Sequence, residues 1–332
     1  MELPLSLRNA IEDSLSGEKP DVLKKVSRQI TERYKNESGQ GKVLVSQDLE
    51  ARVYAAVRMP ATFGAVCDAL SYAKELVDEA SDAGDSGDAA TIRTVYDVGA
   101  GSGSATWAAE EIFAPERICC FEREAAMRKI GADLMKEEPE LAAKTEWSAF
   151  DLEKDAFPGT ADLVMTSYVL NELSSSAREA VVGKLWAAAD KMLVIVEPGT
   201  KEGFAVVREI RKQVLAMGGN LVAPCPHDGP CRLASDDWCH FSCRVARSKL
   251  HKQLKDADVP YEDEKYAYIA FSKMPVKKAS ARVLRHPVIS KGQIELSLCT
   301  ASENKNAVIR KRDGAAFKVA KKCKMGDRFE EI

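Results

Sequence analysis

The chain has 332 residues, 45% apolar and 30% charged, an ordinary globular balance that excludes global disorder. This length allows one large domain or two to three small ones. No stretch approaches about 18 consecutive apolar residues, so we expect no membrane span. The first residues include Glu2, Glu12 and Asp13 and resemble neither a secretory signal nor an Arg-rich transit peptide, which predicts a cytoplasmic protein.

Charge is distributed unevenly along the chain. From Lys273 to the end there are 15 basic and 6 acidic residues, a net charge of +9, whereas the rest of the chain has a net charge of −12. A basic tail on an acidic body indicates contact with a polyanion, most simply nucleic acid, or else a solvated basic face. Charge alone leaves both interpretations open.

The first 90 residues are expected to form a helical region and a linker. Apolar residues recur at helical spacing from Leu5 to Leu15 and from Val22 to Tyr34. A third helical segment runs from about Asp48 to Leu76, with a break expected near Pro60. Residues 80–91 are rich in Gly, Asp and Ser, which predicts a linker or long surface loop.

Residues 91–273 show strands alternating with helices, which predicts an α/β domain with a parallel sheet covered by helices on both faces. The expected strands are Thr94–Val98, Arg117–Phe121, Ala161–Thr166, Lys191–Val196 and Tyr266–Phe271, and the expected helices begin at Ser104, Arg123 and Gly203. Residues 274–332 have shorter β-rich runs, which predict a small basic antiparallel β module with strands at Ala281–Ile289, Gln293–Thr300 and Ala307–Lys311.

A glycine loop follows the first expected strand and opens a helix. Its glycines run as G-x-G-x-G, and Ser104 occupies the third site of the dinucleotide fingerprint, so the loop departs from the nicotinamide pattern. It fits the first motif of S-adenosylmethionine-dependent methyltransferases, which makes the fold class Rossmann-like. Glu122 is placed to accept both ribose hydroxyls, and Asp151 lies in the region that meets adenine. The expected cofactor-binding residues are Asp97, Gly99, Ala100, Gly101, Gly103, Glu122 and Asp151; the alternative is a purely structural turn.

The segment after the third expected strand, Thr166–Glu172, is where such enzymes often carry catalytic residues. It contains neither the Asn/Asp-Pro-Pro-aromatic motif for exocyclic amines nor the Pro-Cys motif of pyrimidine C5 methyltransferases. Tyr168, Asn171 and Glu197 are candidates, each more often structural, so no catalytic residue is identified.

Four cysteines and two histidines lie within 19 residues, in a Pro/Gly-rich segment of a metal-binding region at about 224–262. Clustered thiolates in a loop are typical of metal sites. The spacing C-x5-C-x7-C of Cys225, Cys231 and Cys239 is unusual for zinc and more compatible with an iron–sulfur cluster. The fourth ligand is either the local Cys243 or the distant Cys299.

The chain resembles one methyltransferase-like family. The resemblance is carried by the combination of five motifs: APCPHDGPC, DWCHF, PYEDEKYAYIAF, LCT and DVGAGSGSATWAA. The family comprises the mitochondrial ribosomal small-subunit protein and assembly factor and bacterial relatives regarded as rRNA methylases. The resemblance runs from about Arg52 to about Gly326. The cysteine motif is very specific, whereas the glycine loop alone is not.

The resemblance implies a 4Fe-4S cluster, with zinc as the alternative, on Cys225, Cys231, Cys239 and Cys299. The family reads WCHF-x-Gln-Arg where this chain has Ser242-Cys243-Arg244, so Cys243 is a spare thiol beside the ligands. The implied partner is small-subunit rRNA in the assembling subunit. We expect the RNA-binding residues to be Lys277, Lys278, Arg282, Arg285, Arg310, Lys311 and Arg312.

Two functions from different classes follow. The first is an S-adenosylmethionine-dependent rRNA methyltransferase that acts during small-subunit assembly. The second is a non-catalytic rRNA-binding assembly factor with a structural or redox-sensing cluster. Both are expected without a membrane contact and as a monomer away from the ribosome, in the cytoplasm or, for a eukaryotic source, in mitochondria.

Overall fold

The computed structural model describes residues 1–37, 44–82 and 91–330, and these divide into two compact units. The expected linker at 80–91 lies mostly outside the described residues. No described helix has the length and apolar character needed to cross a bilayer. The first unit comprises Met1–Asp68, Ile92–Asp190 and Cys243–Glu264; the second comprises Ala69–Thr91, Lys191–Ser242 and Lys265–Ile332.

The first unit contains a parallel sheet in the order β3-β2-β1-β4, whose strands have largely buried apolar side chains. The register pairs Asp97 with Cys120 on one side and with Met165 on the other. The order 3-2-1-4 is that of a Rossmann-like sheet, so the predicted fold class is confirmed. The strands are β1 (Thr94–Val98), β2 (Arg117–Glu122), β3 (Thr145–Ala149) and β4 (Ala161–Ser167).

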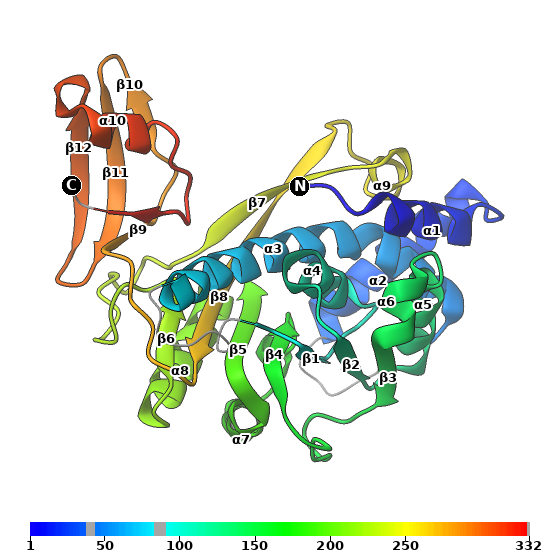
Figure 1. Cartoon of the computed structure of the whole chain (residues 1–332). Coiled ribbons are helices and arrows are strands. Elements are labelled where there is room, and N and C mark those ends of the chain that lie inside the picture. The colour runs from blue at the N-terminus through cyan, green and yellow to red at the C-terminus, as the bar shows by residue number, and fades with distance from the viewer. Residues whose placement is uncertain (38–43, 83–90, 331–332) are drawn as a thin grey trace. The chain divides into compact units, whose positions relative to one another are not determined.

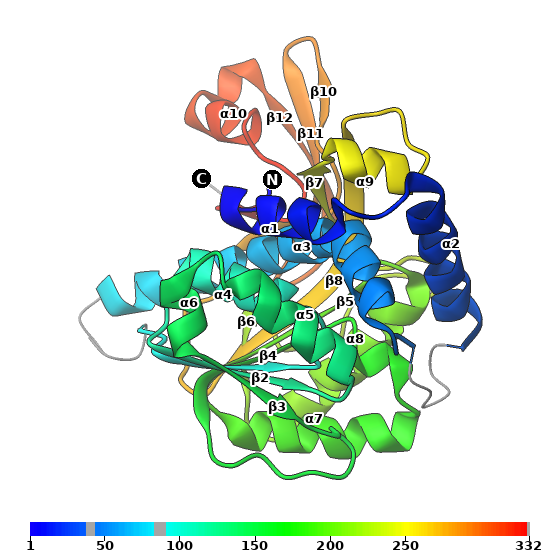
Figure 2. The same ribbon diagram turned by 90° about the vertical axis from the view of Figure 1, so that its right-hand side faces the viewer.

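Helices follow the strands of this sheet and cover both faces. Figure 2 shows α4 (Ser104–Phe113) and α5 (Ala125–Met135) on one face and α7 (Ser175–Ala188) on the other. The Ser174 hydroxyl caps α7 by accepting the amide of Ala177. The short helix α6 (Pro139–Lys144) and the 3-10 turn η1 (Leu170–Glu172) complete this part.

The N-terminal helices pack as part of this unit up to Asp68. They are α1 (Leu5–Leu15), α2 (Pro20–Glu37) and α3 (Asp48–Asp82). The predicted break near Pro60 is wrong, because α3 continues through it. A proline within a helix costs about 3 kcal/mol. Met59, Pro60 and Ala61 are buried, and this packing holds the helix together at the proline.

A segment late in the chain also belongs to the first unit. Most of β7 (Phe241–Ala246) and all of α9 (Lys249–Leu254) lie in it. The helix α9 packs against α2, where the Ser27 hydroxyl donates to the Leu254 carbonyl at 3.3 Å.

The second unit contains most of β5 (Ala189–Pro198) and β8 (Tyr261–Ser272) and all of β6 (Asn220–Ala223), in the order β5-β8-β6. β8 runs antiparallel to both neighbours, so the expected parallel sheet includes one strand of the opposite direction here. A short apolar run does not indicate strand direction, because Tyr266–Phe271 would be equally buried in a parallel or an antiparallel strand. The helix α8 (Lys201–Ala216) follows β5 and is capped by Thr200.

The predicted C-terminal β module forms a separate five-stranded sheet (Figure 1). Its order is β10-β11-β9-β13, with β12 paired to the other edge of β11. The expected strand Ala281–Ile289 is split into two strands, with Pro287 between them. Its elements are β9 (Ala281–Val283), β10 (Val288–Ser290), β11 (Gln293–Thr300), β12 (Asn304–Arg310), η2 (Lys311–Asp313), α10 (Ala315–Ala320) and β13 (Arg328–Phe329).

The module has an apolar core of its own. Leu296 and Leu298 of β11 are fully buried, and Phe317 of α10 packs against this core with part of its ring exposed. The outward-facing side chains of β11 alternate with these, and Cys299 is one of them.

Candidate cofactor and metal sites

The glycine loop after β1 requires glycine at three positions. Gly99, Gly101 and Gly103 have φ values of +72°, +56° and +89°, in the left-handed region that other residues rarely adopt. A Cβ on Gly99 would lie 2.4 Å from Cγ2 of Val169, in the segment after β4. The loop therefore needs glycine both for its backbone and for the close approach of Val169.

Glu122, at the end of β2, holds this loop in place. Its two carboxylate oxygens accept the amides of Gly101 at 2.9 Å and of Glu124 at 2.7 Å. Burial raises the pKa of Glu122, although these amide hydrogen bonds oppose the shift. Each carboxylate oxygen can accept a second hydrogen bond, so Glu122 can also receive hydroxyl groups of a ligand.

Asp97 lies beneath the loop and is completely buried. Its Oδ2 accepts the Thr106 hydroxyl at 2.7 Å, whereas Oδ1 has no hydrogen-bond partner among the described residues. Burial raises the pKa of Asp97 to about 7. Asp97 therefore lies behind the loop, and its contact with Thr106 joins β1 to α4.

The other two expected cofactor residues are placed differently. Ala100 is buried within the loop, and its amide donates to the Phe121 carbonyl. Asp151 follows β3 in a turn, where its carboxylate pairs with Lys154 at 2.7 Å. That ion pair lowers the pKa of Asp151.

Sequence reasoning missed the contribution of the N-terminal helices to this site. Tyr34 of α2 and Tyr54 of α3 stack with ring centroids 5.3 Å apart. Burial raises the pKa of both phenols, and Glu122 and Glu172 add to the shift for Tyr54. In the sequence, a single tyrosine at helical spacing looks the same whether it lies beside a cofactor site or in the ordinary hydrophobic core.

Glu124 connects the segment before α3 to the end of β2. Its carboxylate oxygens accept the amides of Leu44 at 2.7 Å and Val45 at 3.1 Å. Burial raises its pKa to about 7. The segment before α3 is thus attached next to Glu122.

The catalytic candidates after β4 are held by neighbours. Tyr168 has a φ of +60°, strained for a residue other than glycine. Its hydroxyl donates to Oε1 of Glu264 at 3.0 Å, and Arg58 lies 3.8 Å from the same oxygen. Asn171 is exposed in η1, and Glu197 is completely buried at the end of β5. None of these contacts identifies a base.

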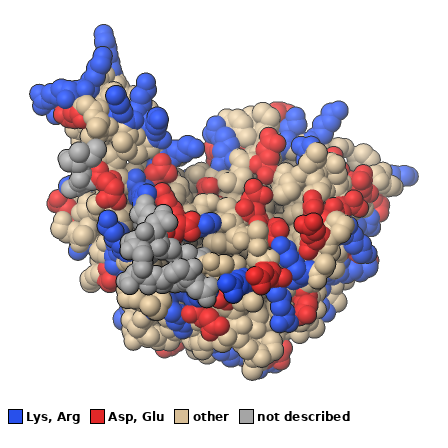
Figure 3. Space-filling model, in the orientation of Figure 1, with Lys and Arg blue, Asp and Glu red and all other residues tan. Residues whose placement is uncertain are grey.

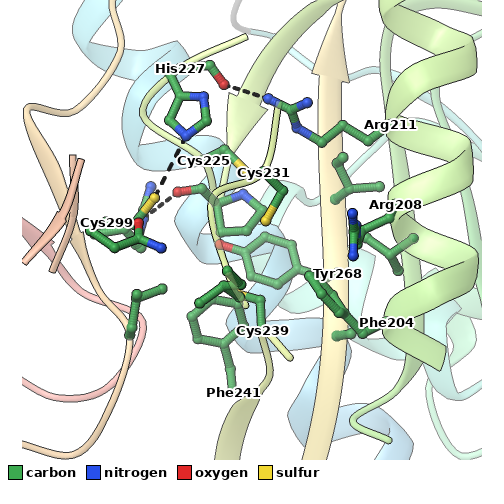
Figure 4. Close-up of a pocket in the computed structure, with 18 residues that line it drawn as sticks. Phe204, Arg208, Arg211, Cys225, His227, Cys231, Cys239, Phe241, Tyr268 and Cys299 are labelled. Carbon is green, nitrogen blue, oxygen red and sulfur yellow. Dashed lines mark hydrogen bonds between the residues drawn. The ribbon is translucent and has the colours of Figure 1, made fainter. Parts of the chain in front are cut away.

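The four predicted cysteine ligands line one pocket in the second unit. Cys225, Cys231 and Cys239 come from the loop after β6, and Cys299 comes from β11 (Figure 4). The free volume inside is about 40 Å³. Cys243 does not line this pocket, because it packs in the first unit where its sulfur faces Gly64 of α3. Of the two candidates for the fourth ligand, Cys243 and Cys299, only Cys299 lies in the same pocket as Cys225, Cys231 and Cys239.

The thiols of this pocket influence one another electrostatically. Burial raises the pKa of Cys299 to about 12, and the neighbouring Cys225 and Cys231 add to the shift. Burial likewise raises the pKa of Cys239, with contributions from the other three cysteines. Bound metal would reverse this effect, because a cation stabilises thiolates. The described residues contain no group of three His, Cys, Asp or Glu side chains already spaced to hold a metal ion.

Cationic side chains attach the cysteine loop to the rest of the second unit. Arg211 of α8 donates to the carbonyls of His227 and Gly229, both at 2.7 Å. Arg282 of β9 donates to the Pro224 carbonyl at 2.9 Å, and Arg285 pairs with Asp237 at 2.5 Å. The loop is therefore bound to the β module at several points besides Cys299.

These contacts divide the seven expected RNA-binding residues. Arg282 is 1% exposed and also donates to the Gly326 carbonyl, so the expectation that its charge faces RNA does not fit this structure. Arg285 is held by Asp237, and Lys278 pairs with Asp228 at 2.7 Å. Four residues remain exposed: Lys277, Arg310, Lys311 and Arg312. Figure 3 shows many Lys and Arg side chains over the module.

The glycine loop, the acid at the end of β2 and the four converging cysteines are the features of a methyltransferase-like protein with a cysteine-rich second site. A sequence model of the family described as "Mitochondrial small ribosomal subunit Rsm22" matches residues 48–330. The chain belongs to this family.

Curated relatives include the human "Ribosome assembly protein METTL17, mitochondrial", 33% identical over 45% of this chain and 36% of that protein. "Rsm22-cox11 tandem protein 2, mitochondrial" of Schizosaccharomyces pombe is 23% identical over 71% of this chain and 38% of its own. The chain thus matches little more than a third of the length of these relatives.

Solved structures with similar folds include methyltransferases. Magnesium protoporphyrin IX methyltransferase from Synechocystis is 14% identical, with a TM-score of 0.41 over 75% of this chain and 97% of that one. A SAM-dependent methyltransferase from Aquifex aeolicus is 12% identical, with a TM-score of 0.36 over 60% and 92%. Identities and TM-scores this low give no information about activity. The fold class is assigned from the strand order instead.

Proposed function

We propose that this chain is an S-adenosylmethionine-binding, methyltransferase-like protein that acts on small-subunit rRNA during ribosome assembly. The observation that carries the proposal is the loop of three left-handed glycines held by Glu122 at the end of β2. The family description and the names of the relatives support the ribosomal part.

The residues present suit S-adenosylmethionine, which supplies an activated methyl group when bound. Gly101 leaves room for close approach to the backbone, since a Cβ there would meet only the end of the Met127 side chain at 3.5 Å, and Glu122 offers acceptors for ribose hydroxyls. Asp97 and Ala100 support the loop from behind. Asp151 is the candidate at the adenine end, provided that it exchanges its partner Lys154.

A non-catalytic assembly factor is the second candidate. It is favoured by the segment Thr166–Glu172, which has neither of the catalytic motifs named above. In that case cofactor binding would stabilise the first unit without methyl transfer.

We further propose that Cys225, Cys231, Cys239 and Cys299 hold a 4Fe-4S cluster, with a single zinc as the alternative. Four thiols around one small pocket are a donor set that suits either metal centre. The metal would then join the loop after β6 to β11 and so fix the basic module. A redox-sensing role for such a centre stays a proposal.

The partner proposed is small-subunit rRNA in the assembling subunit, with the chain monomeric away from it. The family description and the relatives name mitochondrial proteins, so they favour a mitochondrial location and give the cytoplasmic expectation no support.

Two measurements test the function. Calorimetry with S-adenosylmethionine should give binding that Glu122→Ala weakens by at least about tenfold, with Glu153→Ala, in the turn after β3, as the control. Mass spectrometry of small-subunit rRNA nucleosides, from cells carrying either form, then separates the two candidates.

Loss of one methylated nucleoside in the Glu122→Ala cells supports an enzyme. Intact methylation with defective assembly supports the non-catalytic factor. Absence of cofactor binding in the wild-type chain contradicts the proposal for the first unit.

A further inference from the structure

The β module has a concentrated group of cations at one end of its sheet. The turn between β10 and β11 contains Lys291, and the amide of Lys311 donates to the carbonyl of the adjacent Gly292 at 2.9 Å. Arg310 is paired with Gln293 at the start of β11, and Arg312 follows in η2. We call Lys291, Arg310, Lys311 and Arg312 the basic tip; all four side chains are exposed.

The basic tip keeps most of its charge free for a partner. Among its members only Arg312 has a described ion pair, with Asp313 at 3.9 Å. In contrast, the cations nearer the cysteine loop, Arg282, Arg285 and Lys278, are used to hold that loop. Gln293 and Cys299 lie six positions apart on β11, which places the tip about 20 Å from the pocket lining.

The tip also has aliphatic side chains but lacks aromatic ones. Val288 and Ile289 of β10 are 60% and 63% exposed. The sequence from 274 to 330 contains no Trp or Tyr, and its two Phe residues, Phe317 and Phe329, pack with the module core. Proteins that bind unpaired RNA gain about 1–3 kcal/mol per base from aromatic stacking, a gain that this surface does not offer.

We propose that the basic tip binds the phosphate backbone of base-paired RNA, with Val288, on the same face of the sheet as Arg310, against the wide, shallow minor groove. This inference rests on the proposed action on rRNA and specifies which form of RNA the module recognises. Lys291, absent from the expected RNA-binding set, becomes part of the surface, and Arg282, Arg285 and Lys278 leave it.

Fluorescence anisotropy with the full chain tests the inference. The probes are an RNA duplex of about 16 base pairs and one of its strands alone, chosen to be unstructured. We expect the duplex to bind at least about tenfold more tightly than the single strand, because it presents more phosphates at the tip.

The variant K291Q/R310Q/K311Q/R312Q should lower duplex affinity by roughly 100-fold and reduce the slope of log affinity against log salt by about 3. The matched control is K19Q/K25Q/K35Q/K249Q, which removes four exposed charges from the first unit and should leave the affinity unchanged. Circular dichroism checks that both variants remain folded.

Each other outcome has a defined meaning. Equal or tighter binding of the single strand, or an unchanged salt slope in the tip variant, overturns the inference and leaves the proposed action on rRNA standing. Equal displacement by polyaspartate would show a general polyanion surface and also overturn it. Failure of the wild-type chain to bind either probe contradicts the RNA part of the proposed function itself.

Discussion

At the scale of single residues, the cofactor loop depends on backbone conformations that side chains disturb. Gly99 combines a left-handed φ with a predicted Cβ contact of 2.4 Å to Val169. Gly183 on α7 is the opposite case, since a Cβ there meets nothing within 4 Å. The two positions form a matched pair for the same substitution.

Gly99→Ala should lower the free energy of unfolding by about 2–4 kcal/mol, from backbone strain together with the clash. Gly183→Ala should raise it by about 0.5–1 kcal/mol, because alanine favours a helix. Urea unfolding measures both. Val169→Ala should restore part of the loss in the Gly99 variant, and no restoration in the double variant would argue against the contact.

Asp97 predicts a pH dependence of stability. Its pKa rises to about 7 in the folded chain, from an ordinary value near 4, so between these values the folded state binds the extra proton. Its contribution is therefore present at pH 4 and is lost as the pH rises through about 7.

Asp97→Asn should remove this dependence. Relative to wild type, the variant should gain on the order of 3 kcal/mol of stability between pH 4 and 7.5, as measured by urea unfolding at both values. Thr106 can still donate to the amide oxygen of the asparagine. A wild-type-minus-variant difference that does not change with pH would contradict the buried, protonated state.

At the scale of elements, helices and strands with a clear local sequence pattern could be predicted, whereas features decided by tertiary packing could not. Strands β1, β2, β4 and β5 lie close to their expected positions, because each is an apolar run bounded by turn residues. The continuous α3 and the antiparallel β8 were not predictable, since packing decided both. The glycine loop and the cysteine loop were recognisable because G-x-G-x-G after a strand and several cysteines in a Pro/Gly-rich segment are uncommon patterns.

The basic residues show a different limit of sequence reasoning. Seven cations in one module looked equivalent, yet Arg282 is buried and holds the Pro224 and Gly326 carbonyls, whereas Arg310 is exposed. Charge alone does not distinguish a solvated arginine from one that satisfies backbone carbonyls. Only the three-dimensional contacts separate them.

Arg282→Gln should therefore lower stability, and Arg310→Gln should lower RNA affinity. Loss of a buried guanidinium with two carbonyl partners costs about 2–4 kcal/mol. Hydrogen exchange should become faster in β9, β11 and the cysteine loop of the Arg282 variant and stay unchanged in the Arg310 variant. Equal hydrogen-exchange rates in the two variants would contradict a structural role for Arg282.

At the scale of the whole molecule, the two sites belong to different compact units. The glycine loop and its surroundings lie in the first unit, and the four cysteines, the loop after β6 and the β module lie in the second. Loss of the proposed metal should consequently affect the second unit while the first keeps its cofactor affinity.

Cys299→Ser tests this separation. Because Cys299 is the only one of the four proposed ligands that comes from β11, we expect faster hydrogen exchange in residues 281–329 and weaker binding of duplex RNA. Calorimetry with S-adenosylmethionine should give an unchanged affinity. A parallel loss of cofactor binding would show that the units do not respond independently.

The most direct test of the account is anaerobic purification followed by visible absorption and iron, sulfide and zinc analysis of the wild-type chain and Cys299→Ser. The account predicts a brown protein with about four iron and four sulfide per chain, and bleaching with loss of iron in the variant. A colourless wild-type protein without iron or sulfide would contradict the cluster. One zinc per chain would leave a structural metal centre without a redox role.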